Sequence, residues 1–171
     1  MRLDLREIIE VPGVRLPFSH TLDTQALDLP GVTGYPSPPQ AQGVVRNAAG
    51  ALELDGTLRA ELTVLCDRCG RPFPLKIDLP LYVPLAQEGE SAENPDTFFL
   101  DGDALNLSEL LETCLILNMD SKRLCKPDCL GLCPTCGADL NEGPCACGRQ
   151  TDPRLAGLKQ LLDMNNTTRG L

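Results

Sequence analysis

The sequence predicts an α+β fold: mainly an antiparallel β meander or partly open barrel, with one or two short helices and a C-terminal zinc-binding cysteine module. Three observations indicate it. Two long segments alternate apolar and polar residues, a later segment repeats leucine at helical spacing, and six of the nine cysteines lie between Cys125 and Cys147. Proline and glycine contribute 15 residues each, a composition typical of a small sheet with many turns.

Both predicted strands are long. Residues 51–64 place leucine, alanine or valine at almost every second position, with charged or hydroxyl side chains between them, which indicates a half-buried strand. Residues 73–85 repeat the pattern, but three of their intervening positions are proline. Because proline cannot donate a hydrogen bond to a neighbouring strand, we expect this second strand at a sheet edge or on a bulged path. Residues 43–50 predict the preceding hairpin.

The second half of the chain predicts two short helices. Residues 86–97 are acidic and poor in apolar side chains, so we expect a solvated loop, and residues 98–100 add a short strand. Residues 107–118 carry leucines on one helical face, with a plausible helix start at Ser108. A further helix begins at Asp152, where a capping aspartate is followed by proline.

Three parts are expected along the chain: a β-rich body with one helix over residues 1–121, a cysteine-rich zinc module over 122–150, and a short helix and tail over 151–171. The proline-rich segment up to Gln42 has no assignable pattern. Acidic residues outnumber basic ones by 19 to 8 through Asp120, whereas the remainder has 7 basic and 5 acidic residues. Nucleic-acid affinity comes largely from neutralised phosphates, so the acidic body offers no general footprint for RNA or DNA.

The first residues argue against a secretory signal. Asp4, Glu7 and Glu10 interrupt the stretch where a signal peptide needs an unbroken apolar run, and no later run approaches the roughly 18 apolar residues of a membrane span. A cytoplasmic location is predicted. Disulfides are disfavoured in that reducing compartment, and the odd cysteine count agrees.

Cys66 and Cys69 form a Cys-x-x-Cys-Gly motif at the tip of the predicted hairpin. A thioredoxin-type redox pair places its first cysteine at a helix N-terminus, but a proline-containing strand follows here. In a zinc knuckle the turn presents both sulfurs to one metal, and the glycine lets the backbone fold toward them. The spacing therefore favours a metal ligand pair over a redox pair.

The remaining cysteines complete the predicted metal sites. In the favoured partition the tail closes one site by itself, and a leftover pair reaches back to the hairpin and fastens the tail to the sheet. The ligands are Cys133, Cys136, Cys145 and Cys147 in one site, and Cys66, Cys69, Cys125 and Cys129 in the other. A rival partition makes one site from Cys125, Cys129, Cys133 and Cys136, and spacing alone does not decide between them. Four thiolates with no open position indicate structural Zn²⁺, with two sites per chain.

Other chemistry has weaker support. The spacing of Cys129, Cys133 and Cys136 matches the iron–sulfur motif of radical enzymes that use S-adenosylmethionine, but those enzymes are large α/β barrels with the motif early in the chain. Cys114 lies among leucines at helical spacing and is interpreted as a core residue. The single histidine, His20, has no nucleophile motif beside it in the sequence. We therefore expect a protein that is not an enzyme.

The motifs together resemble a known family. They are Cys66-Asp-Arg-Cys69-Gly-Arg-Pro-Phe after an alternating strand, Leu-Cys125-x-x-x-Cys129-x-Gly-Leu-Cys133-Pro-x-Cys136-Gly-x-x-Leu-Asn141-Glu-Gly-x-Cys145-x-Cys147, and Asp152-Pro-Arg-Leu-x-x-Leu-x-x-Leu. Over residues 2–162 the chain resembles the bacterial YceD family of large ribosomal RNA subunit accumulation proteins. The resemblance implies a role in synthesis, processing or stability of that RNA. Some relatives lack the tail cluster, which implies a separable module, and Asn118-Met119 departs from the family's usual Leu-Pro.

Two functions are compatible with these observations. The first is a non-enzymatic, zinc-binding accessory protein whose partner is a ribosomal protein, a pre-ribosomal particle or a ribosomal RNA maturation factor. The second is direct RNA binding through basic residues around the zinc module, namely Lys122, Arg123, Lys126, Arg149, Arg154 and Lys159. The acidic body favours the first, although a local basic rim still allows phosphate contact. No membrane and no small-molecule substrate is expected.

Overall fold

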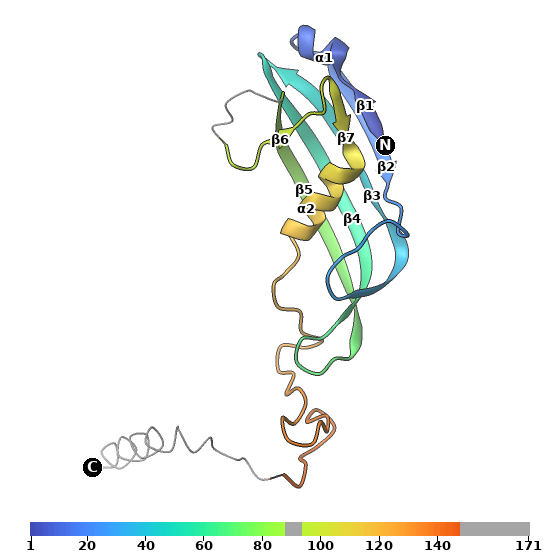
Figure 1. The fold of residues 1–171 in the computed structure, drawn as a ribbon, viewed down its shortest axis with the longest axis vertical. Helices are drawn as coiled ribbons and strands as arrows, with labels where there is room; N and C mark the ends of the chain where they lie inside the picture. The colour runs from blue at the N-terminus through green and yellow to red at the C-terminus, as the bar shows by residue number, and fades with distance from the viewer. Residues whose placement is uncertain (88–93, 148–171) are drawn as a thin grey trace, which may run out of the picture. The chain divides into compact units, whose positions relative to one another are not determined.

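The computed structural model describes residues 1–87 and 94–147. The elements follow one another as β1 (Arg2–Asp4), α1 (Arg6–Glu10), β2 (Arg15–Thr21), β3 (Val32–Ala48), β4 (Ala51–Leu65), β5 (Pro72–Ala86), β6 (Phe98–Phe99), β7 (Ala104–Asn106) and α2 (Leu107–Leu117) (Figure 1). The chain divides into two compact units, Met1–Pro127 and Asp128–Leu171, and every one of these elements belongs to the first.

The main sheet is a meander of five strands in the order β2-β3-β4-β5-β6. The first four strands pair antiparallel, as predicted, and β4 and β5 keep one register from Leu52↔Leu85 to Leu65↔Pro72. The short β6 joins β5 in parallel through two residue pairs, which the sequence did not predict. Because the edge strands β2 and β6 do not pair with each other, the sheet is not closed into a barrel within the described residues.

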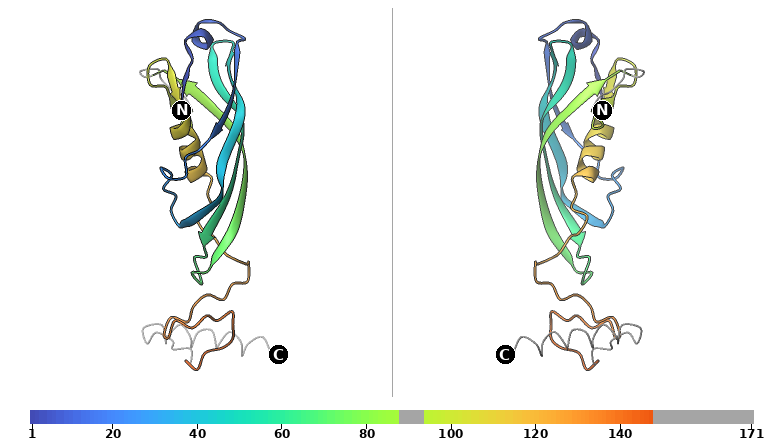
Figure 2. Two further views of the ribbon diagram at one scale, coloured as in Figure 1. Left: turned by 90° about the vertical axis from the view of Figure 1, so that its right-hand side faces the viewer. Right: turned by 90° about the vertical axis from the view of Figure 1, so that its left-hand side faces the viewer.

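The alternation predicted for β4 and β5 is confirmed by burial. The even-numbered side chains of β4 point into the core, and α2 lies along this face of the sheet (Figure 2). The opposite face is polar and carries exposed cross-strand ion pairs such as Lys76–Glu61 at 2.8 Å, which solvent screens. Seven leucines of β4 and α2 are fully buried in one core cluster: Leu54, Leu58, Leu62, Leu107, Leu110, Leu111 and Leu115.

The prolines of β5 lie where they do not interrupt its pairing with β4. Pro72, Pro74, Pro80 and Pro84 are all even-numbered, and alternate residues of a strand direct their backbone groups to opposite sides. The carbonyl of Ala86 accepts a hydrogen bond at 2.9 Å from Leu100, beside β6, so the even-numbered residues face away from β4. Since β6 reaches only the last two residues of β5, most of β5 is the expected edge strand.

The N-terminal segment, which had no assignable pattern, contributes two strands to the main sheet. β3 is far longer than the predicted hairpin arm, and the turn from Asn47 to Gly50 is confirmed. Asn47 is buried, and its side-chain amide donates to the carbonyl of Ile8 at 2.8 Å while its oxygen accepts from the Gly50 amide at 2.8 Å. These bonds attach α1 to the end of the β3–β4 hairpin.

The predicted helix at 107–118 is observed, but its start differs. Asn106 is the N-cap and no side chain caps the helix. The Ser108 hydroxyl lies inside the first turn, 2.9 Å from His20 Nε2 of β2. The expected strand at 98–100 corresponds to β6, whereas the helix expected from Asp152 lies outside the described residues. In the part of the chain that the structure describes, no helix is long and apolar enough to cross a membrane.

Candidate metal centres

Eight of the nine cysteines lie in two groups of four, and within each group the sulfur atoms are all within 4.8 Å of one another. The first cysteine group is Cys66, Cys69, Cys125 and Cys129, and the second cysteine group is Cys133, Cys136, Cys145 and Cys147. These are the sets of the favoured partition. The rival set is divided, because two of its members belong to each group.

The first cysteine group starts at the tip of the β4–β5 hairpin. The Cys66 amide donates to the Arg71 carbonyl at 2.9 Å, and the Gly70 amide donates back to the Cys66 carbonyl at 2.8 Å. Gly70 has a φ of 69°, a left-handed conformation that L side chains rarely adopt, so the Cys-x-x-Cys turn requires glycine there. The hydrogen bonds fold the turn so that both sulfurs face the same side.

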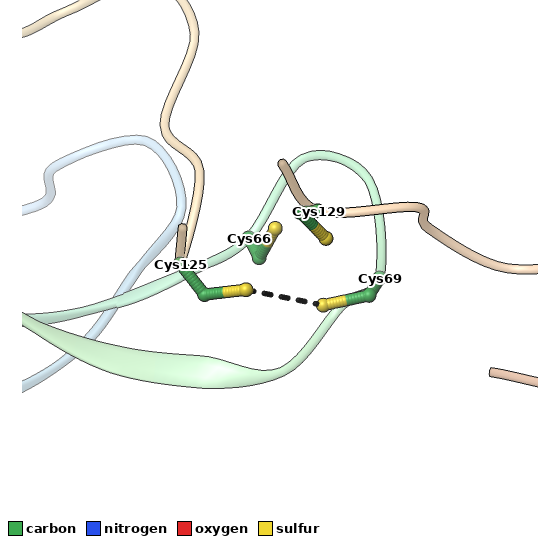
Figure 3. A group of neighbouring side chains, drawn as sticks. All are labelled: Cys66, Cys69, Cys125 and Cys129. Carbon is green, nitrogen blue, oxygen red and sulfur yellow. Dashed lines mark hydrogen bonds between the residues drawn. The ribbon is translucent and has the colours of Figure 1, made fainter. Parts of the chain in front are cut away.

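Backbone pairing brings Cys125 to this turn. The Asp67 amide donates to the Arg123 carbonyl at 2.9 Å, and the Arg123 amide donates to the Asp67 carboxylate at 2.5 Å. Cys125 follows two residues later, and its sulfur lies 3.7 Å from that of Cys69. Figure 3 shows the four sulfurs converging from the hairpin turn and the later segment. The 67–123 pairing, 56 residues apart in sequence, is a positioning contact that the motif spacing did not reveal.

The Arg123 side chain also fixes the loop before β3. Its Nη1 donates to the carbonyl of Pro30, and its guanidinium packs so closely on Gly31 that a Cβ there would lie 2.6 Å from Nη2. The side chain is only 14% exposed, and its Nε is a buried donor without a hydrogen-bond partner among the described residues. Arg123, predicted as part of a basic rim, is therefore engaged inside the protein and is not available for phosphate contact.

The second cysteine group repeats the same turn. The Cys133 amide donates to the Ala138 carbonyl at 2.8 Å, the Gly137 amide donates to the Cys133 carbonyl at 2.9 Å, and Gly137 has a φ of 74°. The Thr135 amide points at the Cys133 sulfur at 3.4 Å. A single bridge between Leu132 and Asp139 stands in place of a hairpin. The two turns thus have the same local structure but very different lengths of sheet behind them.

Asn141 lies between the two cysteine pairs of the second group. Its side-chain oxygen accepts from the Leu130 amide at 2.9 Å, and its side-chain amide lies 3.5 Å from the sulfur of Cys129 and 2.7 Å from Asp139. The same side chain therefore touches a sulfur of the first cysteine group and shapes the loop of the second. The sequence motif contained this asparagine, but its contacts are visible only in the structure.

In both cysteine groups the thiols lie so close together that the pKa values of several are shifted from their usual range. Burial raises the pKa of Cys66, but hydrogen bonds from the backbone amides of Cys125, Cys69 and Arg68 outweigh this effect and lower the pKa to about 6. In the second group the amides of Cys136 and Thr135 lower the pKa of Cys133 to about 6. The hydrogen bond with Cys136 raises the pKa of Cys147 to about 12. Thiols this close cannot all ionise unless a cation compensates their charge.

The donor sets fit zinc. Tetrahedral zinc with Zn–S bonds of about 2.3 Å separates its sulfurs by about 3.8 Å, close to the 3.7 Å between Cys69 and Cys125. Disulfide sulfurs lie only about 2.05 Å apart. None of the nine cysteines, all within the described residues, forms a disulfide. Zinc at these positions would supply positive charge and a four-way cross-link.

The other predicted residues lie as follows. Cys114 belongs to neither group and packs half-buried against the core, where burial raises the pKa of its thiol. Lys122 and Lys126 are exposed. Arg149, Arg154 and Lys159 lie outside the described residues. His20 faces α2 and meets Ser108, and burial lowers its pKa.

Comparisons with known proteins give a family and its relatives. Residues 54–162 match the family model described as large ribosomal RNA subunit accumulation protein YceD. Uncharacterized proteins of Mycobacterium tuberculosis and Mycobacterium bovis are each 27% identical over 128 residues, which is 72% of this chain and 62% of theirs. A maize protein named large ribosomal RNA subunit accumulation protein YCED homolog 1, chloroplastic, is 29% identical over 67% of this chain and 50% of its own.

The corresponding Arabidopsis thaliana protein is 26% identical over 70% of this chain. The chain thus spans about half to three-fifths of the length of the curated relatives it matches. No solved structure matches it.

Proposed function

Because the chain belongs to the YceD family, we propose that it supports accumulation of large-subunit ribosomal RNA as a non-enzymatic accessory protein with two structural zinc ions. The family match over residues 54–162 is the observation that carries the role. The two groups of four sulfurs support the zinc ions, since catalytic zinc keeps a ligand position for water and four thiolates leave none.

The proposed partner is a protein or a ribonucleoprotein particle. Acidic residues dominate the body, and Arg123, one of the candidate RNA contacts, is bound to Pro30 and Asp67. Among the described residues after Asp120, Lys122 and Lys126 are the exposed basic residues, and two such charges do not give strong phosphate binding by themselves. A ribosomal protein, a pre-ribosomal particle or an RNA maturation factor therefore suits the surface better than naked RNA.

The role is tested in cells that lack the gene. We expect large-subunit ribosomal RNA to fall relative to small-subunit RNA, and the unchanged chain to restore it. The Cys133→Ser and Cys66→Ser variants separate the contributions of the two cysteine groups, and Cys114→Ser is the matched control because Cys114 belongs to neither group. Unchanged ribosomal RNA in the deletion strain would contradict the proposed role.

The partner class is tested with purified components. The zinc-loaded chain is mixed either with protein-free large-subunit RNA or with pre-ribosomal particles, at increasing salt. We expect retention on the particles and little on the RNA. Salt-sensitive binding to the RNA alone, weakened in a Lys122→Ala/Lys126→Ala variant, would instead establish direct RNA binding.

A further inference from the structure

An open groove of about 590 Å³ runs between the edge strand β5 and the helix α2. Its walls are mainly apolar, and one of the side chains of its helical wall, Leu117, is 75% exposed. Cys114 lies in the helical wall. All the lining residues belong to the first compact unit, and none is a member of a cysteine group.

The stretch of sequence that forms the groove carries charge of one sign. The sequence contains no lysine, arginine or histidine between Lys76 and Lys122, the stretch that supplies every wall of the groove. Asp78 and Asp101 of this stretch pair with Arg59 and Arg2 from other strands. Asp96 lines the groove, and Glu109 and Glu112 lie on α2, the helix that forms one wall. An apolar groove with one carboxylate in its lining and two more on its helix is complementary to a segment that combines apolar and basic side chains.

The edge of β5 disfavours an added strand as the occupant. A strand that pairs with this edge needs outward-facing amide donors, but Pro80 and Pro84 have none, which leaves Tyr82 as the outward donor beside the groove. An amphipathic helix needs no backbone donors from its groove, because its own amides are satisfied internally.

We infer that this groove binds a basic amphipathic helix of a protein partner. Apolar side chains of the partner enter between β5 and α2, and its lysines or arginines face the carboxylates of the groove lining and of α2. The site is separate from both cysteine groups, so the inference holds whether or not these bind zinc.

The test uses a synthetic peptide of about 15 residues with leucine and lysine at helical spacing, labelled for fluorescence anisotropy. Two control peptides replace its lysines by glutamate or its leucines by serine. We expect the leucine–lysine peptide to bind in the presence of moderate salt and neither control to do so. Equal binding of the serine–lysine peptide would mean attraction by charge alone and would overturn the inference.

Matched variants locate the binding. Leu117→Glu alters a highly exposed groove residue and should weaken peptide binding about tenfold or more, whereas Val11→Glu, also at an exposed apolar position but not among the groove residues, should change it less than about twofold. Bound peptide should also slow alkylation of Cys114, followed by mass spectrometry. Equal effects of the two variants, or unchanged Cys114 alkylation, would place the peptide elsewhere.

Analytical ultracentrifugation of the chain without peptide tests whether a second copy of the chain occupies the groove instead. We expect no self-association that depends on Leu117. A dimer that Leu117→Glu dissociates, together with failure to bind the peptide, would show that the groove accepts a second copy and would overturn the inference.

Discussion

The two cysteine turns have the same pattern of hydrogen bonds and a left-handed glycine at the same position, but they differ in the secondary structure that supports them. Behind Cys66 run two strands of 15 residues each, packed on a leucine core. Around Cys133 the described residues form one isolated bridge, and Cys136 is exposed. We therefore expect the sheet to hold the first turn with or without metal, and the second turn to need metal for its structure.

Metal removal gives the largest expected difference between the turns. With a chelator and a reductant present, residues 131–147 should lose all amide protection, because few other interactions hold them, while β4 and β5 should remain protected by their ladder and core. Hydrogen exchange with mass spectrometry measures both regions in one sample. Simultaneous loss of protection in the sheet would show that the first turn also needs metal.

Single cysteine changes separate the two sites. Cys66→Ser should abolish the first zinc and destabilise the sheet by about 1–3 kcal/mol, because Cys66 is only 3% exposed and its replacement leaves a hydroxyl near the core. Cys133→Ser should abolish the second zinc without a change in the sheet's melting temperature. Metal analysis and thermal unfolding report the two effects, and loss of both zincs in either variant would mean that the sites are not independent.

The two turn glycines give a smaller, paired effect. Gly70→Ala and Gly137→Ala each place a Cβ at a positive φ, which costs about 1 kcal/mol. Gly70→Ala should lower the free energy of unfolding of the sheet, whereas Gly137→Ala should weaken zinc binding by the second cysteine group. Competition with a chromophoric chelator follows the second effect. The same response to both substitutions would contradict the proposed difference between the turns.

The smallest predicted effect concerns Arg123. Arg123→Lys removes the planar guanidinium that contacts Pro30 and packs on Gly31, so zinc should leave the first cysteine group several-fold faster while the second is unaffected. Stopped-flow zinc release measures both rates. Lys122→Arg is a control for charge and size at an exposed neighbour. Equal acceleration in both groups would remove Arg123 as a positioning residue of the first.

The sequence predicted secondary structure best where apolar and polar residues alternate regularly along one strand. Strands β4 and β5 bury one face over an unbroken register, so period-two alternation is visible along both. In β3 the register shifts three times between Val32 and Gln40, and each shift moves side chains to the other face, which removes the alternation. The early segment therefore had no readable pattern although it forms sheet.

The same distinction applies to the candidate site. Cys-x-x-Cys-Gly spacing identified both turns because the fold of each turn is local. The contacts that position the remaining ligands are not local: Asp67 meets Arg123 across 56 residues, and Asn141 reaches the Cys129 sulfur across 12. His20 and Ser108 meet across 88 residues on facing elements. Such partners follow from the fold, and spacing alone does not specify them.

We propose that eight of the nine cysteines form two separate four-thiolate zinc sites and that Cys114 lies outside both. Zinc analysis combined with thiol titration of the native, reduced protein tests this directly. We expect two zincs per chain and one reactive thiol, assigned to Cys114 by peptide mapping, with eight more thiols released by a chelator. One zinc per chain, or a brown iron-containing protein, would contradict it.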